Sequence, residues 1–198
     1  MGNEQLMQDV ASRQTVIADS HLALDSLSAY FAKLRDLTFS RATEIPLNLS
    51  SFSLRDLLNI CIGKLNPSNN KKVVVNLHPD TDITITADKI HLINIIDNLL
   101  ENAVKYSRED VHIEIDYQEQ DNDSIRISVK DNGLGISKSD SRHIFEKFYR
   151  SRAVIDKGIP GMGLGLTYVR MLVEAHRGTI RIESEQTSGS TFIIELPQ

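Results

Sequence analysis

The chain has 198 residues, of which 40% are hydrophobic and 25% are charged, and its formal net charge is −5. This balance is typical of a globular protein and excludes a disordered chain, while the acidic excess argues against a nucleic-acid-binding protein. Cys61 is the only cysteine, so no disulfide can form within the chain, and a reducing, cytoplasmic compartment is expected. No apolar run reaches the length of a membrane-spanning helix.

The first 43 residues are predicted to form one long helix. Residues 4–42 contain neither Gly nor Pro, and Val10, Ile17, Leu24 and Phe31 recur every seven residues, as in a coiled coil. A single helix of this length cannot bury such a seam against itself. We therefore expect an intermolecular helical bundle; the alternative is a helix that packs on its own domain.

Helical and strand patterns follow one another through residues 44–198. Helices are predicted at 51–65, with Ser53 or Ser51 as the N-cap, at 88–107 and at 166–178. Strands are predicted at 71–77, 83–87, 111–118, 124–130, 179–184 and 190–196. These blocks predict an α+β fold, a two-layer sandwich with helices on one face of a mixed sheet.

The helix predicted at 88–107 carries an unusual polar face. Asn98 and Asn102 are four residues apart and share this face, with Lys105 and Tyr106 close by, whereas the opposite face, from Ile90 onward, is expected in the core. Asn is a poor helix former, so two of them inside a helix call for an explanation. An amide oxygen can bind Mg²⁺ and a lysine can neutralise phosphate. A helix that shows its polar side to water is the alternative.

The first of two glycine loops, "DNGLGI", ends a predicted strand. Gly133 and Gly135 lack a Cβ, so the backbone can turn sharply and approach a flat ligand closely. The carboxylate of Asp131 can accept a hydrogen bond from an exocyclic amine such as that of adenine. The alternative is an ordinary turn with a solvated Asp.

The second glycine loop, "GMGLGL", precedes a predicted helix. Gly161, Gly163 and Gly165 can expose successive backbone N–H groups at a helix N-terminus, which favours phosphate. No Lys-Ser/Thr pair follows, so the loop is not a P-loop, and taken alone it is a weak signal.

The Asn-rich helix and the two glycine loops, in this order, resemble the GHKL nucleotide-binding superfamily of gyrase, heat-shock chaperone, histidine kinase and mismatch-repair ATPases. "DNLLENAVKYS" is similar to the N box of sensor histidine kinases, and "IFEKFYR" is similar to their F box. "GMGLGLTYVRMLVEAHRGTIRIES" and "GSTFIIELP" are similar to the rest of their catalytic domain. The resemblance covers residues from about 47 to 197. It implies a Bergerat-type ATP-binding domain at 44–198 with a lid over ATP at about 136–160.

The resemblance also implies roles for individual residues. Asn102 would bind Mg²⁺, Asn98 and Lys105 would lie near the phosphates of ATP, Tyr106 would pack on the adenine side, and Asp131 would bond the adenine amine. Further ATP-binding residues are expected in the glycine loops, the lid and the last strand: Gly133, Gly135, Ile136, Phe148, Arg150, Gly161, Gly163, Leu164, Gly165, Leu166 and Thr191.

Asn98 also bears on the type of reaction. The ATP-hydrolysing relatives carry a Glu at this place as the general base for water, and an amide cannot take up a proton. Slow hydrolysis of ATP is therefore expected, as suits a kinase that keeps ATP for a side-chain acceptor.

Two features depart from the family pattern. Met162 stands where Ser or Thr is usual, which removes one hydroxyl contact to phosphate. Histidine kinases phosphorylate a His on a dimeric two-helix hairpin, and residues 1–43 resemble only its second helix. His21 is the only His there, Leu22 follows it, and no Pro lies nearby, so we interpret His21 as an ordinary helix residue. The phosphoacceptor helix is therefore expected to be missing.

The sequence thus predicts a protein-histidine kinase fragment that transfers the γ-phosphoryl group of Mg-ATP to a histidine outside it. The expected partners are the histidine-bearing dimerisation helix of a homodimeric parent kinase, which can be membrane-anchored, and a response regulator receiver domain. The alternative is a nucleotide- or partner-binding module without phosphotransfer activity, which Met162 supports. Asn98 argues against an autonomous gyrase-type ATPase, and the heptad helix with the F box argues against a protein-serine kinase.

Overall fold

The computed structural model describes residues 45–65, 71–107, 110–121 and 123–198. The helix predicted over 4–42, with its heptad seam and His21, lies outside these residues. The described residues all belong to one structural unit, Arg41–Gln198.

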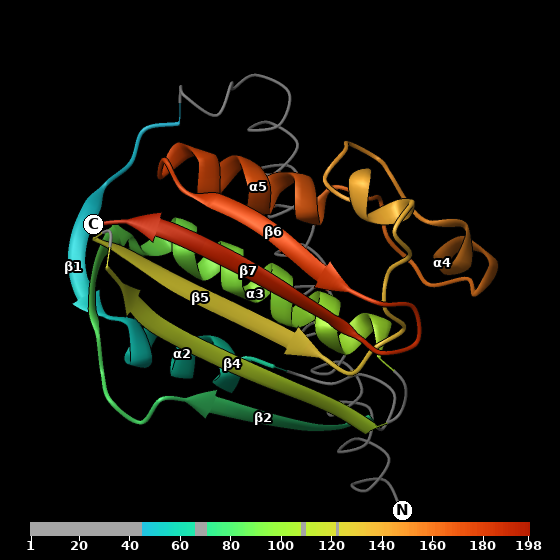
Figure 1. The fold of residues 1–198 in the computed structure, drawn as a ribbon, viewed down its shortest axis with the longest axis horizontal. Helices are drawn as coiled ribbons and strands as arrows, with labels where there is room; N and C mark the ends of the chain where they lie inside the picture. The colour runs from blue at the N-terminus through green and yellow to red at the C-terminus, as the bar shows by residue number, and fades with distance from the viewer. Residues whose placement is uncertain (1–44, 66–70, 108–109, 122) are drawn as a thin grey trace, which may run out of the picture. The chain divides into compact units, whose positions relative to one another are not determined.

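A five-stranded sheet forms one layer of this unit, with the strand order β2-β4-β5-β7-β6 (Figure 1). The pair β2–β4 is parallel, and the other three pairs are antiparallel. A separate antiparallel pair, β1–β3, lies at one end of the sheet. The bounds of the strands are Leu49–Ser53 for β1, Lys72–His78 for β2, Thr84–Asp88 for β3, Asp110–Gln120 for β4, Ser124–Asp131 for β5, Thr179–Ser184 for β6 and Ser190–Pro197 for β7.

Three helices form the second layer on one face of the sheet: α2 (Leu54–Gly63), α3 (Lys89–Tyr106) and α5 (Gly165–Ala175). The core lies between the layers because alternate residues of the central strands point toward the helices and are buried. Two short helices, η2 (Asp140–Arg142) and α4 (Arg152–Asp156), lie in the predicted lid. The predicted two-layer α+β sandwich with a mixed sheet is confirmed.

Two local features differ from the sequence prediction. The helix predicted at 51–65 begins at Leu54, and of its two predicted caps Ser53 is confirmed, because the Ser53 hydroxyl accepts a hydrogen bond from the N–H of Asp56. The five residues before the helix form β1, which the sequence pattern did not indicate. Ile90 is 71% exposed instead of buried. It lies in the first turn of α3, on the outer face that also carries Asp97, so its side chain points away from the sheet.

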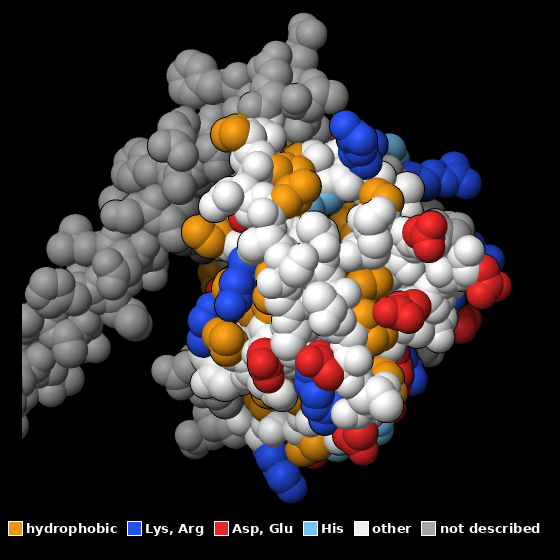
Figure 2. Space-filling model, turned by 90° about the vertical axis from the view of Figure 1, so that its left-hand side faces the viewer, with side chains coloured by type: hydrophobic (Ala, Val, Ile, Leu, Met, Phe, Trp, Pro, Cys, Tyr) orange, Lys and Arg blue, Asp and Glu red, His pale blue; other side chains and the backbone are white. Residues whose placement is uncertain are grey.

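The end of the unit that carries β1 is shown as a surface in Figure 2. Leu49 and Ile90, 55% and 71% exposed, are large apolar residues of β1 and of the start of α3. Hydrophobic side chains of the described residues appear at several separate places on this face, between polar and charged ones.

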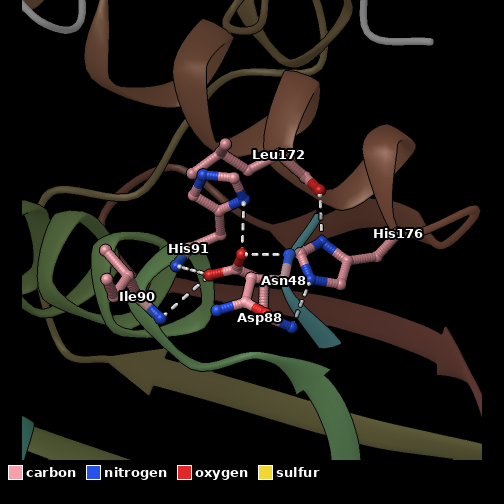
Figure 3. A network of polar contacts seen from close by, with 6 residues as sticks. All are labelled: Asn48, Asp88, Ile90, His91, Leu172 and His176. Atoms are coloured by element: carbon pink, nitrogen blue, oxygen red, sulfur yellow. Dashed lines mark hydrogen bonds and ion pairs between the residues drawn. The ribbon is translucent and has the colours of Figure 1, made fainter. Parts of the chain in front are cut away.

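A buried polar network joins the start of α3, the end of α5 and the segment before β1 (Figure 3). The Asp88 carboxylate caps α3 by accepting hydrogen bonds from two N–H groups of its first turn, and it also accepts one from the N–H of Asn48 at 2.8 Å. The N–H of Asp88 donates to Nε2 of His176 at 3.1 Å, and Nδ1 of His176 lies 2.7 Å from the Leu172 carbonyl. His176 is therefore neutral, with its proton on Nδ1, and burial lowers the pKa of its imidazole.

Candidate nucleotide site

The second half of α3 supplies the polar side chains of the site. Asn98 is 6% exposed, and its Nδ2 donates to the Asn94 carbonyl at 2.6 Å. Asn102, Lys105 and Tyr106 follow toward the end of the helix and are half-buried. The predicted polar face therefore does not simply point to water; it is partly covered by other elements.

The second glycine loop is one of these covering elements. A Cβ added to Gly165 would lie 3.2 Å from Oδ1 of Asn98, and a Cβ added to Gly161 would lie 2.5 Å from Nζ of Lys105. Residues without a side chain let the loop approach α3 this closely. The loop also starts α5, which has no side-chain cap in the structure, so the N–H groups of its first turn can bind an anion instead.

The first glycine loop lies between the end of α3 and the turn that joins β6 to β7. The N–H of Leu134 donates to the Tyr106 carbonyl at 3.1 Å, and the N–H of Thr187 in the turn donates to the Leu134 carbonyl at 2.8 Å. Gly135 has a φ of +65°, and its Cβ position is only 2.0 Å from the carbonyl oxygen of Glu185. Only glycine fits such an approach, so the turn fixes the path of the loop.

Asp131 ends β5 on the helix side of the sheet. Its Oδ1 accepts a hydrogen bond from the N–H of Gly133 at 2.7 Å. Burial raises the pKa of its carboxyl group, and the N–H groups of Gly133 and Ser190 counteract this by stabilising the carboxylate. A buried carboxylate with remaining acceptor capacity can select a ligand that offers an amine.

The structure does not bring Thr191 to Asp131. In the β5–β7 register Asp131 pairs with Ser190, whereas Thr191 pairs with Lys130 and lies on the opposite face of the sheet. Ser190 is 6% exposed, and its Oγ lies 3.1 Å from that of Ser184. Ser190 is the residue that sequence reasoning missed, although the inward alternation of β7 could have indicated it.

The predicted lid is held in place by several side-chain hydrogen bonds. Ile136, where the lid begins, donates its N–H to Oγ of Ser184 at 2.8 Å. Tyr149 donates its hydroxyl proton to Oδ1 of Asp140 at 2.6 Å, a bond that raises the pKa of the phenol to about 12. The same carboxylate accepts from the hydroxyl of Ser137 at 2.7 Å. These bonds give the first part of the lid a defined shape.

The F box connects this lid to the second glycine loop. Phe148 has a φ of +65°, donates its N–H to the Gly163 carbonyl at 3.0 Å and is 65% exposed. Arg150 donates a hydrogen bond to the Ile159 carbonyl, near the far end of the lid. Leu164 is buried at the N-cap of α5, and Leu166 is half-buried in its first turn.

Two cations, Lys105 and Arg150, lie near each other beside the second glycine loop. Burial is the main cause that lowers the pKa of Lys105, and the nearby charge of Arg150 lowers it further, while Glu101 opposes both. A partly buried pair of like charges is stabilised by a bound anion. The arrangement therefore fits a polyphosphate.

A divalent cation would have to be held by amide oxygens at this place. The described residues contain no group of three or more His, Cys, Asp or Glu side chains suited to a metal ion. Asn102 offers an amide oxygen on the half-buried face of α3, which is a fitting ligand for Mg²⁺ if phosphates and water supply the others.

Comparisons with known proteins agree with this geometry. The family model described as "Histidine kinase-, DNA gyrase B-, and HSP90-like ATPase" matches residues 87–198. "Sensor protein RprX" of Bacteroides fragilis is 40% identical over 129 residues, which are 65% of this chain and 25% of that protein. "Sensor histidine kinase GacS" of Pseudomonas protegens is 31% identical over 178 residues, which are 87% of this chain and 19% of that protein.

The solved structures agree as well. The crystal structure of full-length ShkA in complex with AMPPNP matches with a TM-score of 0.73 and 26% identity, over 90% of this chain and 38% of that chain. By comparison, the chain spans only a quarter or less of the length of the two curated relatives, RprX and GacS. Among the residues that the structure describes, no helix is both long and apolar enough to cross a membrane.

Proposed function

Because the chain belongs to the family of histidine kinase-, DNA gyrase B- and HSP90-like ATPases and carries the catalytic domain of sensor histidine kinases, we propose that it binds Mg-ATP between α3 and the two glycine loops. It transfers the γ-phosphoryl group to a histidine on another segment of the parent kinase. The convergence of both loops on the second half of α3 carries this proposal: Gly161 lies against Lys105, and Gly133 lies 3.0 Å, by its Cβ position, from the Tyr106 carbonyl.

The adenine end lies at the first glycine loop. The Asp131 carboxylate accepts a hydrogen bond from the exocyclic amine, and the ring of Tyr106 packs beside the base. Gly133 and Gly135 keep the loop free of side chains, and Ile136 follows where the lid begins. Ser190 supports Asp131 through its backbone N–H, and Thr191, on the other face of the sheet, is left out of the proposed site.

The phosphate end lies at the second glycine loop. The backbone of Gly161, Gly163 and Gly165 presents N–H groups to the phosphates, and Lys105 and Arg150 neutralise their charge. Asn102 holds Mg²⁺, which supplies charge neutralisation at the phosphates when bound. Phe148 keeps the lid against the loop through its bond to Gly163.

The reaction needs positioning more than proton transfer by this domain. Asn98 has no ionisable proton, and its Nδ2 is already used in the bond to Asn94, so it does not activate water. The chain therefore orients ATP and excludes water, while the acceptor histidine, outside this chain, is the nucleophile. In the parent protein this histidine lies on a helix that pairs with residues 1–43 in a homodimer. A response regulator receiver domain then takes the phosphoryl group, and the domain works in the cytoplasm, where ATP is available.

Transfer in trans tests this function. The full chain is incubated with γ-labelled ATP, alone and together with a separately purified helical hairpin of a sensor kinase that carries the acceptor histidine. We expect no label on the chain alone and acid-labile label on the hairpin. Label on His21, or ATP binding without transfer to any acceptor hairpin, would contradict the proposed reaction.

A further inference from the structure

Lys71 closes the C-terminal end of α3 from a distant part of the chain. It lies directly before β2, and its Nζ donates to the Val104 carbonyl at 2.6 Å and to the Ser107 carbonyl at 2.8 Å. The last carbonyls of a helix have no partner within it. The ammonium group supplies such a partner, and its charge is favourable at the negative end of the helix dipole.

The turn that Lys71 closes is the turn that carries the proposed nucleotide contacts. Lys105 and Tyr106 lie between the two carbonyls that Lys71 binds. The Tyr106 carbonyl accepts the N–H of Leu134 from the first glycine loop at 3.1 Å. A loss of order in this turn would therefore move the phosphate side and the adenine side of the site together.

The charge of Lys71 also matters for an anionic ligand. The C-terminus of a helix carries a partial negative charge, about half an elementary charge, which repels phosphate. In the structure this end of α3 lies beside both glycine loops. An ammonium group bound directly to its carbonyls offsets that charge.

We propose that Lys71 is a positioning residue of the nucleotide site. It holds the last turn of α3, and through this turn Lys105, Tyr106 and the first glycine loop, in the geometry that binds ATP. This inference rests on the proposed function, because it assumes that the site binds a nucleotide. No local pattern in the sequence indicates this role, since Lys71 belongs to none of the motifs that carry the family resemblance.

Three variants separate this role from a general effect of charge. Lys71→Met keeps the aliphatic stem and removes the ammonium group, whereas Lys71→Arg keeps a cation that can donate to two carbonyls. Lys72→Met removes the same charge one residue later, from an exposed side chain, and is the matched control. Each full chain is titrated calorimetrically with a non-hydrolysable ATP analogue in the presence of Mg²⁺. Amide hydrogen exchange of residues 103–107 and 134 is measured in parallel.

We expect Lys71→Met to bind the analogue about tenfold more weakly, Lys72→Met to change the affinity less than about twofold, and Lys71→Arg to recover most of the loss. Exchange should accelerate at the last turn of α3 and at Leu134 but not in β6 and β7. Equal affinities of Lys71→Met and Lys72→Met would overturn the proposed role of Lys71, while leaving the proposed function intact. Equally accelerated exchange in all elements would also overturn it, because it would indicate a general loss of stability. A wild-type chain that binds no analogue would refute the proposed function, and with it this inference.

Discussion

Replacing Gly163 by Ala should disconnect the lid from the second glycine loop. Gly163 has a φ of +72°, and the left-handed backbone costs an L-residue about 1–2 kcal/mol. In addition, the new Cβ would lie 2.6 Å from the Tyr149 carbonyl oxygen and 2.7 Å from the carbonyl carbon of Phe148. Both are backbone atoms, so the F box has to move away instead of a side chain turning aside.

Gly158 provides the matched control within the same lid. Its φ is +64°, so Ala has the same backbone cost, but a Cβ there would meet no described atom within 4 Å. We expect Gly163→Ala to weaken binding of a non-hydrolysable ATP analogue at least about tenfold, which corresponds to ~1.4 kcal/mol. Gly158→Ala should leave the affinity within about twofold of wild type while lowering the free energy of unfolding by ~1 kcal/mol. Calorimetric titration and urea unfolding of both variants measure these quantities. Equal affinities of the two variants would refute the packing argument.

Three further predictions concern other parts of the unit. Asp131→Asn should reduce the preference for ATP over GTP by about ten- to a hundredfold, because a hydrogen bond to a charged group contributes that much. Competition titrations with the two nucleotides measure the preference, and an unchanged preference would contradict the contact between Asp131 and adenine. Tyr149→Phe removes the 2.6 Å bond to Asp140 and should make the lid more sensitive to limited proteolysis, with less than about tenfold loss of nucleotide affinity. Burial keeps the pKa of His176 in the folded chain below its ordinary value of 6.5. As the pH decreases, this imidazole therefore takes up a proton in the unfolded chain before it does so in the folded chain. The free energy of unfolding should therefore fall as the pH decreases through 6.5, and it should fall less steeply in His176→Gln than in the wild type. Urea unfolding at several pH values measures this, and the same pH dependence in both proteins would exclude His176 as the cause.

The fold and most of the candidate site could be predicted because their signals are local. The alternation in residues 111–118 and 124–130 indicated β4 and β5, and the glycine spacing indicated two loops with close backbone approaches. Asn98, Lys105 and the two loops converge in the structure as the family resemblance implied. These features depend on residue type and spacing, which a sequence shows directly.

The rest depends on tertiary contacts that no local pattern records. Ser190 and Thr191 both carry a hydroxyl group and are neighbours in sequence, but they occupy opposite faces of β7. The face of each is set by the pairing with β5. Lys71 reaches α3 across more than thirty residues of sequence. Ile90 looked like a core residue because apolar residues follow it in α3, yet it lies in the first turn of the helix and is 71% exposed.

The most direct test of the central claim is a calorimetric titration of the full chain with a non-hydrolysable ATP analogue, with and without Mg²⁺. It compares the wild type, Asn102→Ala and the control Asn59→Ala, whose exposed amide lies on α2. We expect binding that strengthens with Mg²⁺ in the wild type and in Asn59→Ala, and that loses this dependence in Asn102→Ala. Absence of binding in the wild type would contradict the proposed nucleotide site, and a Mg²⁺ effect that Asn102→Ala leaves intact would contradict the role of Asn102.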